Sequence, residues 1–162
     1  MRVAGIIKNS VVNGIGIRDV IFLQGCEHHC KGCHNPETWN PNGGIEYGVL
    51  TLYHLFDKST NNLTISGGDP LLQLDDLERL LYIFYLNTEK TVWIYTGYKF
   101  EDIPMNTWTR LSKLNVEVVV DGRFEIDKKD LTLEFRGSSN QRIIDLKKSV
   151  EHGEVVLWTG KN

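Results

Sequence analysis

The chain has 162 residues, of which 24% are charged and 41% hydrophobic, and its formal net charge is −3. This composition excludes a wholly disordered chain, and no apolar run is long enough to form a transmembrane helix. The slightly acidic balance disfavours nucleic-acid binding, which normally needs a basic surface. We therefore expect a single domain over residues 1–162 that works in the cytoplasm and binds neither nucleic acid nor a membrane.

Short apolar runs alternate with helical patterns along the chain. Runs rich in β-branched and aromatic residues predict buried strands at residues 20–23, 63–65, 92–95 and 116–120. Apolar residues at spacings of three and four predict helices at 49–56, 74–84 and 108–114. This alternation is typical of an α/β fold with a mostly parallel sheet, and the chain is too short for a complete eight-stranded barrel.

Each predicted strand is followed by an unusual polar or glycine-containing segment, at residues 25–35, 66–70, 96–98 and 121–123. Because the carboxyl ends of parallel strands meet at one edge of a sheet, we expect these segments to form one site.

All three cysteines, Cys26, Cys30 and Cys33, lie within the first of these segments in a C-x3-C-x2-C spacing. An odd, clustered set is a poor disulfide framework, so the thiols are candidate metal ligands. Three thiolates could hold a [4Fe–4S] cluster with one iron left open, or a zinc ion with a nearby histidine as fourth ligand. The spacing favours the cluster, and both alternatives remain open.

The second segment contains adjacent glycines, Gly67 and Gly68, between Ser66 and Asp69. Adjacent glycines let a backbone approach a ligand closely, and an aspartate can accept hydrogen bonds from an ammonium group. The alternative is a tight turn in which Asp69 caps a helix that has Pro70 at its first position.

The cysteine motif after the first predicted strand, together with the glycine-rich segment after the second, resembles the radical S-adenosylmethionine enzymes. Residues 12–18, 34–39, 93–98 and 119–124 are similar to the branch that activates glycyl-radical enzymes. Residues 135–145 and Gly32 are typical of activases of anaerobic ribonucleoside-triphosphate reductase, and the resemblance extends from Val12 to Leu146.

The resemblance implies a single-domain partial (β/α) barrel of the radical S-adenosylmethionine type. It implies that Cys26, Cys30 and Cys33 ligate a [4Fe–4S] cluster whose fourth iron binds S-adenosylmethionine. The implied activity is reductive cleavage of that cofactor and formation of a glycyl radical on the reductase, with reduced flavodoxin or a similar protein as electron donor. The residues implied in cofactor binding are Gly32, Cys33, His34, Ser66, Gly67, Gly68, Asp69, Thr96 and Arg136.

Two other functions remain as alternatives. The chain could activate another glycyl-radical enzyme, such as pyruvate formate-lyase, or be a non-catalytic zinc-binding adaptor. The polar segment from Arg136 to Gln141 has a similar ambiguity. It is expected either to serve the outer part of the site or to act as a structural clamp between C-terminal strands.

Overall fold

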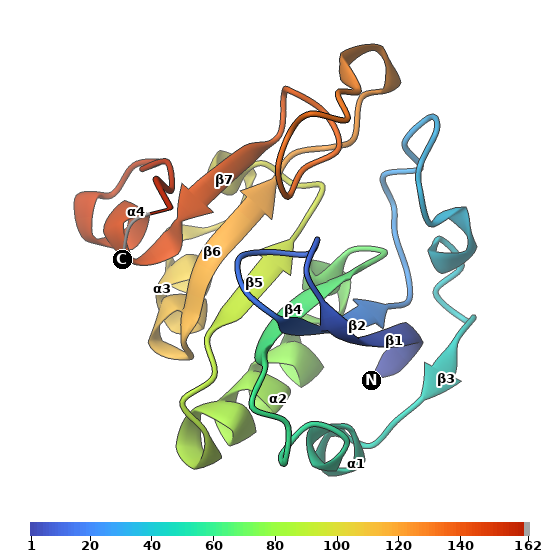
Figure 1. The fold of residues 1–162 in the computed structure, drawn as a ribbon, viewed down its shortest axis with the longest axis vertical. Helices are drawn as coiled ribbons and strands as arrows, with labels where there is room; N and C mark the ends of the chain where they lie inside the picture. Colours follow the sequence, from blue (N-terminus) through green and yellow to red (C-terminus); the bar gives the residue numbers. More distant parts are fainter. Residues whose placement is uncertain (161–162) are drawn as a thin grey trace.

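The computed structural model describes residues 1–160 and has a seven-stranded sheet in the order β3-β1-β2-β4-β5-β6-β7 (Figure 1). The strands are β1 (Arg2–Ser10), β2 (Arg18–Leu23), β3 (Ile45–Glu46), β4 (Asn62–Gly67), β5 (Val92–Tyr95), β6 (Val116–Asp121) and β7 (Arg142–Asp145). The helices are α1 (Val49–His54), α2 (Leu74–Asn87), α3 (Met105–Lys113) and α4 (Leu146–His152).

The centre of the sheet is parallel, as predicted. Strands β2, β4, β5 and β6 are parallel neighbours, and the connections between them contain α1, α2 and α3. The four predicted strands and three predicted helices are therefore confirmed, with small differences at their ends. The strands could be predicted because they are buried, and fully buried parallel strands are nearly continuous runs of β-branched and aliphatic residues.

The expectation of a mostly parallel sheet is wrong, because three of the pairings are antiparallel: β1 with β2, β1 with β3, and β6 with β7. The sequence patterns did not predict β1, β3 or β7. Strand β1 is exposed at residues 7–9, and β7 has a single fully buried residue, Ile144, so neither contains a continuous buried run. The sheet ends at β3 and β7, so the structure shows an open mixed sheet and not a closed barrel.

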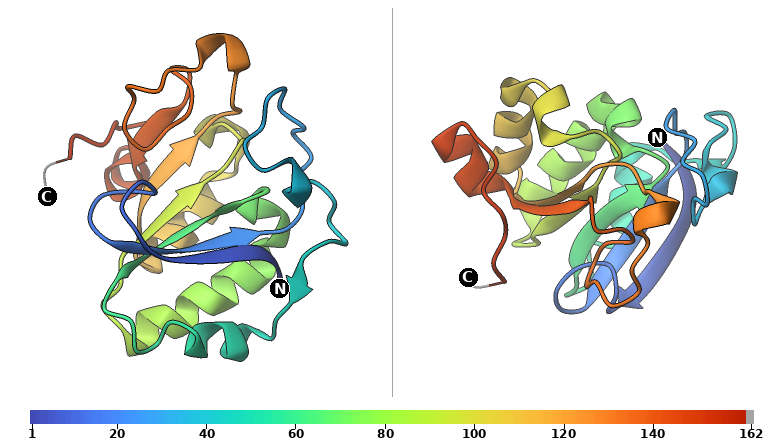
Figure 2. Two further views of the ribbon diagram at one scale, coloured as in Figure 1. Left: turned by 45° about the vertical axis from the view of Figure 1, so that its right-hand side comes forward. Right: turned by 90° about the horizontal axis from the view of Figure 1, so that it is seen from above.

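The two faces of the sheet are covered differently. The helices gather on one side, and loops 11–17 and 122–141 lie on the other (Figure 2). The main hydrophobic core lies on the helical side and includes the buried residues Ile21, Ile65, Ile94 and Leu80. A smaller cluster of Trp93, Val118 and Val120 packs with partly buried Tyr95, Phe135, Ile143 and Trp158. The face without helices is therefore left to loops, which leaves room for a site.

A fully buried arginine, Arg18, stabilises the sheet on the face that carries no helices. The Arg18 guanidinium donates to Thr64 Oγ1 at 2.8 Å and to the Leu63 carbonyl at 2.6 Å, and it lies over the Trp93 ring. Burial lowers the pKa of Arg18 to about 10. The two hydrogen bonds join the start of β2 to β4, and the ring contact joins it to β5. Together they compensate for removing a charge from water.

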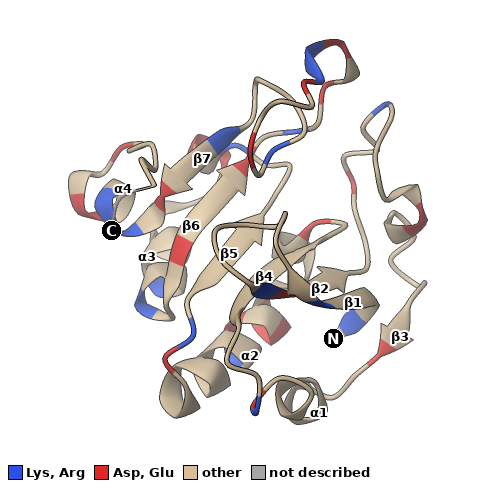
Figure 3. Cartoon of the chain, viewed as in Figure 1, with Lys and Arg blue, Asp and Glu red and all other residues tan. Residues whose placement is uncertain are grey.

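Charges of both signs are interspersed over the elements seen in Figure 3. At the tip of loop 122–141, for example, Lys128 pairs with Glu125 at 2.6 Å. Within residues 1–160, no helix combines the length and the apolar character needed to cross a membrane.

Candidate functional site

The cysteine loop leaves the end of β2 and closes back on a short 3₁₀ helix, Pro36–Thr38. The Gly25 amide donates to the Thr38 carbonyl at 2.7 Å, and the Cys26 amide donates to the Trp39 carbonyl at 3.2 Å. The loop therefore has a defined backbone path although it contains no regular secondary structure.

The three cysteines are free thiols of intermediate exposure. Burial raises the pKa of both the Cys26 and the Cys30 thiol. The Asn35 amide donates to Cys33 Sγ at 3.4 Å, and the Cys33 amide donates to the Cys30 carbonyl at 3.0 Å. Because metals bind the thiolate, a metal bound here would displace the thiol protons.

Three free cysteine thiols on one loop are a donor set of the kind that ligates an iron–sulfur cluster. Among residues 1–160, no three or more His, Cys, Asp and Glu side chains are grouped closely enough to hold one metal ion. A zinc site needs four ligand atoms converging on one centre, with sulfur at ~2.3 Å. An iron–sulfur cluster distributes its cysteine ligands over different irons, so their sulfur atoms stand farther apart.

A cavity of about 160 Å³ opens beside the cysteines. Its lining combines residues from the cysteine loop with residues that follow β4, β5 and β6, so the expected convergence of the four segments is confirmed. The lining residues that had been predicted from the sequence as site residues are Cys26, Cys30, Cys33, His34, Ser66, Gly67, Gly68 and Thr96. Gly32, Asp69 and Arg136 are not among the residues that line this cavity.

Gly67, the last residue of β4, and Gly68, the next residue, let two stretches of the chain's own backbone approach closely. A Cβ atom at Gly68 would overlap the Gly25 carbonyl, and one at Gly67, which has a φ of 116°, would overlap the backbone of Leu23. The Gly68 amide donates to the Leu23 carbonyl at 2.8 Å. The close approach thus joins the glycine turn to the start of the cysteine loop, while both glycines still line the cavity.

Asp69 is fully buried and caps the short helix Pro70–Gln73. Its Oδ1 accepts from the Leu71 amide at 3.0 Å, and Pro70 occupies the first helical position. The capping alternative predicted for this segment is confirmed. Its Oδ2 accepts from Thr96 Oγ1 at 2.9 Å and from the Gly97 amide at 2.9 Å, so the carboxylate also joins the ends of β4 and β5.

A second cavity of about 600 Å³ adjoins the first and lies between residues 11–13 and loop residues 129–137. Arg136 lines this second cavity. The two cavities share part of their walls, so a ligand that spans both would reach from the cysteines to the outer loops. The shared residues are His34, Asn35, Ser66, Tyr95, Phe124 and Gln141.

Sequence reasoning missed Tyr95 and Phe124 as site residues. Tyr95 ends β5, and its buried hydroxyl has no hydrogen-bond partner among the described residues. Burial raises the pKa of this hydroxyl well above its usual value, so it stays protonated. Phe124 packs against His34 with ring centroids 4.9 Å apart. Both residues follow or end a predicted strand, which is the only signal in the sequence that could have identified them.

The segment from Arg136 to Gln141 has the bonding of a clamp. Arg136 Nη1 donates to the Gln141 carbonyl at 2.7 Å. The Gln141 side chain accepts from the Gly137 amide at 2.9 Å and donates to the Gly122 carbonyl at 3.0 Å. These bonds fasten the end of loop 122–141 to its first residue, Gly122, which directly follows β6.

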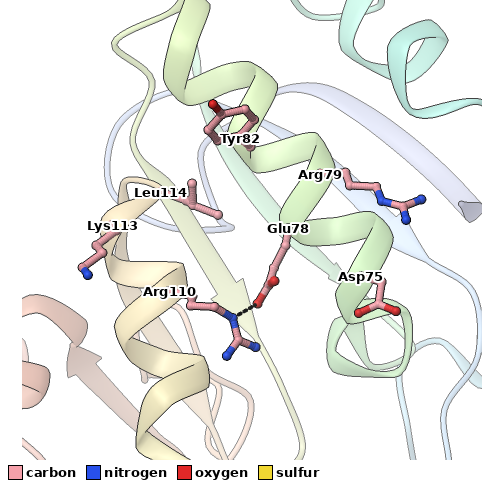
Figure 4. Close-up of a pocket in the computed structure, with 7 residues that line it drawn as sticks. All are labelled: Asp75, Glu78, Arg79, Tyr82, Arg110, Lys113 and Leu114. Atoms are coloured by element: carbon pink, nitrogen blue, oxygen red, sulfur yellow. Dashed lines mark hydrogen bonds and ion pairs between the residues drawn. The ribbon is translucent and has the colours of Figure 1, made fainter.

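A separate groove of about 670 Å³ lies between α2 and α3 (Figure 4). Across it, Arg110 Nε donates to Glu78 Oε1 at 2.9 Å. None of the residues singled out in the sequence lines this groove, so the cysteine cavity is the candidate site. The residues lining the groove are Asp75, Glu78, Arg79, Tyr82, Arg110, Lys113 and Leu114.

Comparison with known proteins agrees with this geometry. The family model described as "4Fe-4S single cluster domain" matches residues 12–144. This range includes the whole cysteine loop and every residue that lines the two cavities except Val11. This defines the class as a domain associated with one iron–sulfur cluster.

Curated relatives identify the family within that class. An anaerobic ribonucleoside-triphosphate reductase-activating protein of Enterobacteria phage T4 is 37% identical over 139 residues, covering 82% of this chain and 86% of its own. Proteins of the same name are 34% identical in Pasteurella multocida, covering 82% of this chain and 90% of their own, and in Escherichia coli K12, covering 85% and 94%. The chain belongs to the family of anaerobic ribonucleoside-triphosphate reductase-activating proteins.

Proposed function

We propose that this protein is a radical S-adenosylmethionine enzyme that forms a glycyl radical on an anaerobic ribonucleoside-triphosphate reductase. The observation that carries the proposal is the convergence of all three cysteines with the turns after β4, β5 and β6 on one cavity. The names of the relatives support the reductase as target, and the matching family supports an iron–sulfur cluster as the bound group.

In this proposal Cys26, Cys30 and Cys33 are the ligands of a [4Fe–4S] cluster. When bound, the cluster supplies one electron that cleaves S-adenosylmethionine to methionine and a 5′-deoxyadenosyl radical, which takes a hydrogen atom from a glycine and leaves 5′-deoxyadenosine and the glycyl radical. The residues Ser66, Gly67, Gly68 and Thr96 line the cysteine cavity, and they are proposed to contact the methionine end of the cofactor.

The other residues proposed to bind the cofactor lie at different parts of the site. His34 lies in the wall shared by both cavities, so it can contact the middle of a ligand that spans them. Arg136 lines the outer cavity and is proposed to contact the adenosyl end or the incoming glycine segment. Gly32, which has a φ of 74°, and the buried Asp69 are proposed to act by shaping the loop and turn around the cofactor.

We further propose that the sheet is the partial barrel of radical S-adenosylmethionine enzymes and that the protein works in the cytoplasm. The four parallel strands with their site at the carboxyl ends support the first point. Clustered free thiols, which need a reducing compartment, support the second. Reduced flavodoxin or a similar low-potential protein is the proposed electron donor.

The test is anaerobic reconstitution of the protein with iron and sulfide, followed by incubation with a reductant and S-adenosylmethionine. We expect about four irons and four acid-labile sulfides per chain, by the composition of the cluster, formation of methionine, and a glycyl radical on added reductase in electron paramagnetic resonance spectra. Tight zinc binding without iron uptake would instead support the adaptor. A radical on pyruvate formate-lyase, but not on the reductase, would support the other activase.

A further inference from the structure

Buried polar atoms without a hydrogen-bond partner gather in the wall of the cysteine cavity. Among the described residues five side-chain atoms are of this kind, and three of them line that cavity: His28 Nδ1, Trp39 Nε1 and the Tyr95 hydroxyl. Proteins rarely leave such atoms unpaired, because a buried polar group without a partner costs free energy. Their concentration in one wall indicates that a bound group supplies the partners.

Tyr95 differs from the other two residues in where it lies. His28 and Trp39 line the cysteine cavity alone, whereas Tyr95 stands in the wall that this cavity shares with the outer one. It is therefore placed to contact the middle of a ligand that spans both cavities.

The packing of Tyr95 within the fold offers its hydroxyl no acceptor. Side chains alternate along a strand, so Tyr95 lies on the same face of β5 as Trp93, and both belong to the cluster with Val118 and Val120. The valines are apolar, and the Trp93 indole is itself a donor, bonded to Glu117 Oε1 at 3.0 Å. An acceptor therefore has to reach the Tyr95 hydroxyl from the cavities.

The cofactor of the proposed function carries acceptors at that point. Its methionine end is assigned to the cysteine cavity, so its ribose lies where the two cavities meet. The sulfonium beside the ribose is positively charged and accepts no hydrogen bond, whereas a ribose hydroxyl can accept one from a phenol.

We propose that the Tyr95 hydroxyl donates a hydrogen bond to a ribose hydroxyl of S-adenosylmethionine and so positions the cofactor between the two cavities. The inference rests on the proposed function, because that function supplies the ligand. Tyr95 is thus a binding residue that the predicted site residues did not include.

The experiment measures the affinity of the cluster-loaded protein for S-adenosylmethionine by anaerobic calorimetry, without reductant or reductase. Tyr95→Phe removes only the hydroxyl, so we expect binding to be about 3- to 10-fold weaker, the usual effect of one neutral hydrogen bond. The free energy of unfolding without the cofactor should not fall, because the hydroxyl has no partner among the described residues to lose.

Tyr82→Phe is the matched control. Tyr82 is 53% exposed on α2 and lines the separate groove between α2 and α3 (Figure 4), so this variant should bind the cofactor with the wild-type affinity.

The 2′-deoxy and 3′-deoxy analogues of S-adenosylmethionine test which atom Tyr95 contacts. The wild-type protein should bind one analogue more weakly than the parent cofactor, and this difference should be smaller in Tyr95→Phe, because the two changes remove the same hydrogen bond.

Equal affinities of the wild-type protein and Tyr95→Phe for S-adenosylmethionine would overturn the proposal. A difference between parent and analogues that is the same in both proteins would also overturn it. If Tyr95→Phe holds no cluster, the wild-type protein decides, since equal affinity for the parent and both analogues would overturn the proposal. A cluster-loaded wild-type protein that does not bind S-adenosylmethionine would instead contradict the proposed function.

Discussion

The three cysteines dominate the site at the scale of single residues. We expect that Cys26→Ala, Cys30→Ala and Cys33→Ala each abolish stable cluster binding, because two remaining thiolates leave two irons without protein ligands. Visible absorbance and iron content after anaerobic reconstitution measure this. His54→Ala, at an exposed position on α1, should load normally. A cysteine variant with a full and stable cluster would show that the ligand assignment is wrong.

A glycine that faces His28 gives a second prediction at this scale. Gly97→Ala places a Cβ atom under 3.0 Å from the His28 ring, so this ring, which is hydrogen-bonded to Asp69, must shift. We expect destabilisation of about 1–3 kcal/mol, the usual range for overpacking at a well-packed position. Gly5→Ala is the control, since a Cβ there meets nothing within 4 Å.

Chemical unfolding of the two glycine variants measures the difference. The double variant Gly97→Ala with His28→Ala removes the ring that the new methyl group meets. Its loss of stability should therefore be smaller than the sum of the two single losses. Additive losses would mean that the Gly97 position is strained for a reason other than His28.

At the scale of elements, the clamp in loop 122–141 depends on one amide side chain. Gln141 joins Gly137 to Gly122, so Gln141→Ala leaves the Gly122 carbonyl and the partly buried Gly137 amide without this partner. We expect a loss of about 1–3 kcal/mol in the free energy of unfolding. Amide hydrogen exchange should show faster exchange at Gly137. Unchanged exchange there would contradict the clamp.

An ion pair between elements predicts a pH dependence. Arg142 on β7 bonds to Glu101 at 2.7 Å and 2.9 Å and to buried Asp121, and this pairing lowers the pKa of Glu101 to about 2. A carboxylate whose pKa is lower in the folded than in the unfolded protein stabilises the fold at pH values above its unfolded pKa of about 4.5. That contribution disappears as the pH falls toward 2.

Glu101→Gln should therefore destabilise the protein at pH 7 by only about 0.5 kcal/mol, because the Glu101 side chain is 56% exposed and solvent screens the pair. The difference from the wild-type protein should shrink between pH 4.5 and pH 2. Unfolding free energies at several pH values test this. A difference that persists at pH 2 would show that Glu101 contributes through packing and not through its charge.

The elements also show how far the sequence determines the fold and the site. The buried strands were predictable because burial on both faces requires runs such as Val116–Asp121. Strand β1 was not, because residues 7–9 are exposed and only the isolated residues Val3 and Ser10 are buried. The cysteine cavity was predictable from where each segment follows a strand. The burial of His28 was not, since its partner Asp69 is 41 residues away and no local pattern records that contact.

At the scale of the whole molecule, the helices cover one face of the sheet and leave the site to the opposite side and the strand ends (Figure 2). The two adjoining cavities lie among loops 11–17, 25–35 and 122–141, which pack on the sheet through few buried apolar residues. Loops with so little core of their own are the parts of a protein that open first. A ligand that fills both cavities should therefore tie these loops together.

This arrangement predicts that S-adenosylmethionine stabilises the protein only when the cluster is present, because the proposed site for its methionine end includes the open iron. At a ligand concentration of 100 times Kd, binding adds about 2.7 kcal/mol to the free energy of unfolding. For a chain of this length, that corresponds to a rise in Tm of about 5–10 °C. Anaerobic thermal unfolding of reconstituted protein, with and without the cofactor, measures the shift, and Cys30→Ala treated in the same way provides the cluster-free control. An equal shift in both proteins would mean that the cofactor binds without the cluster, and the proposed arrangement of the site would be wrong.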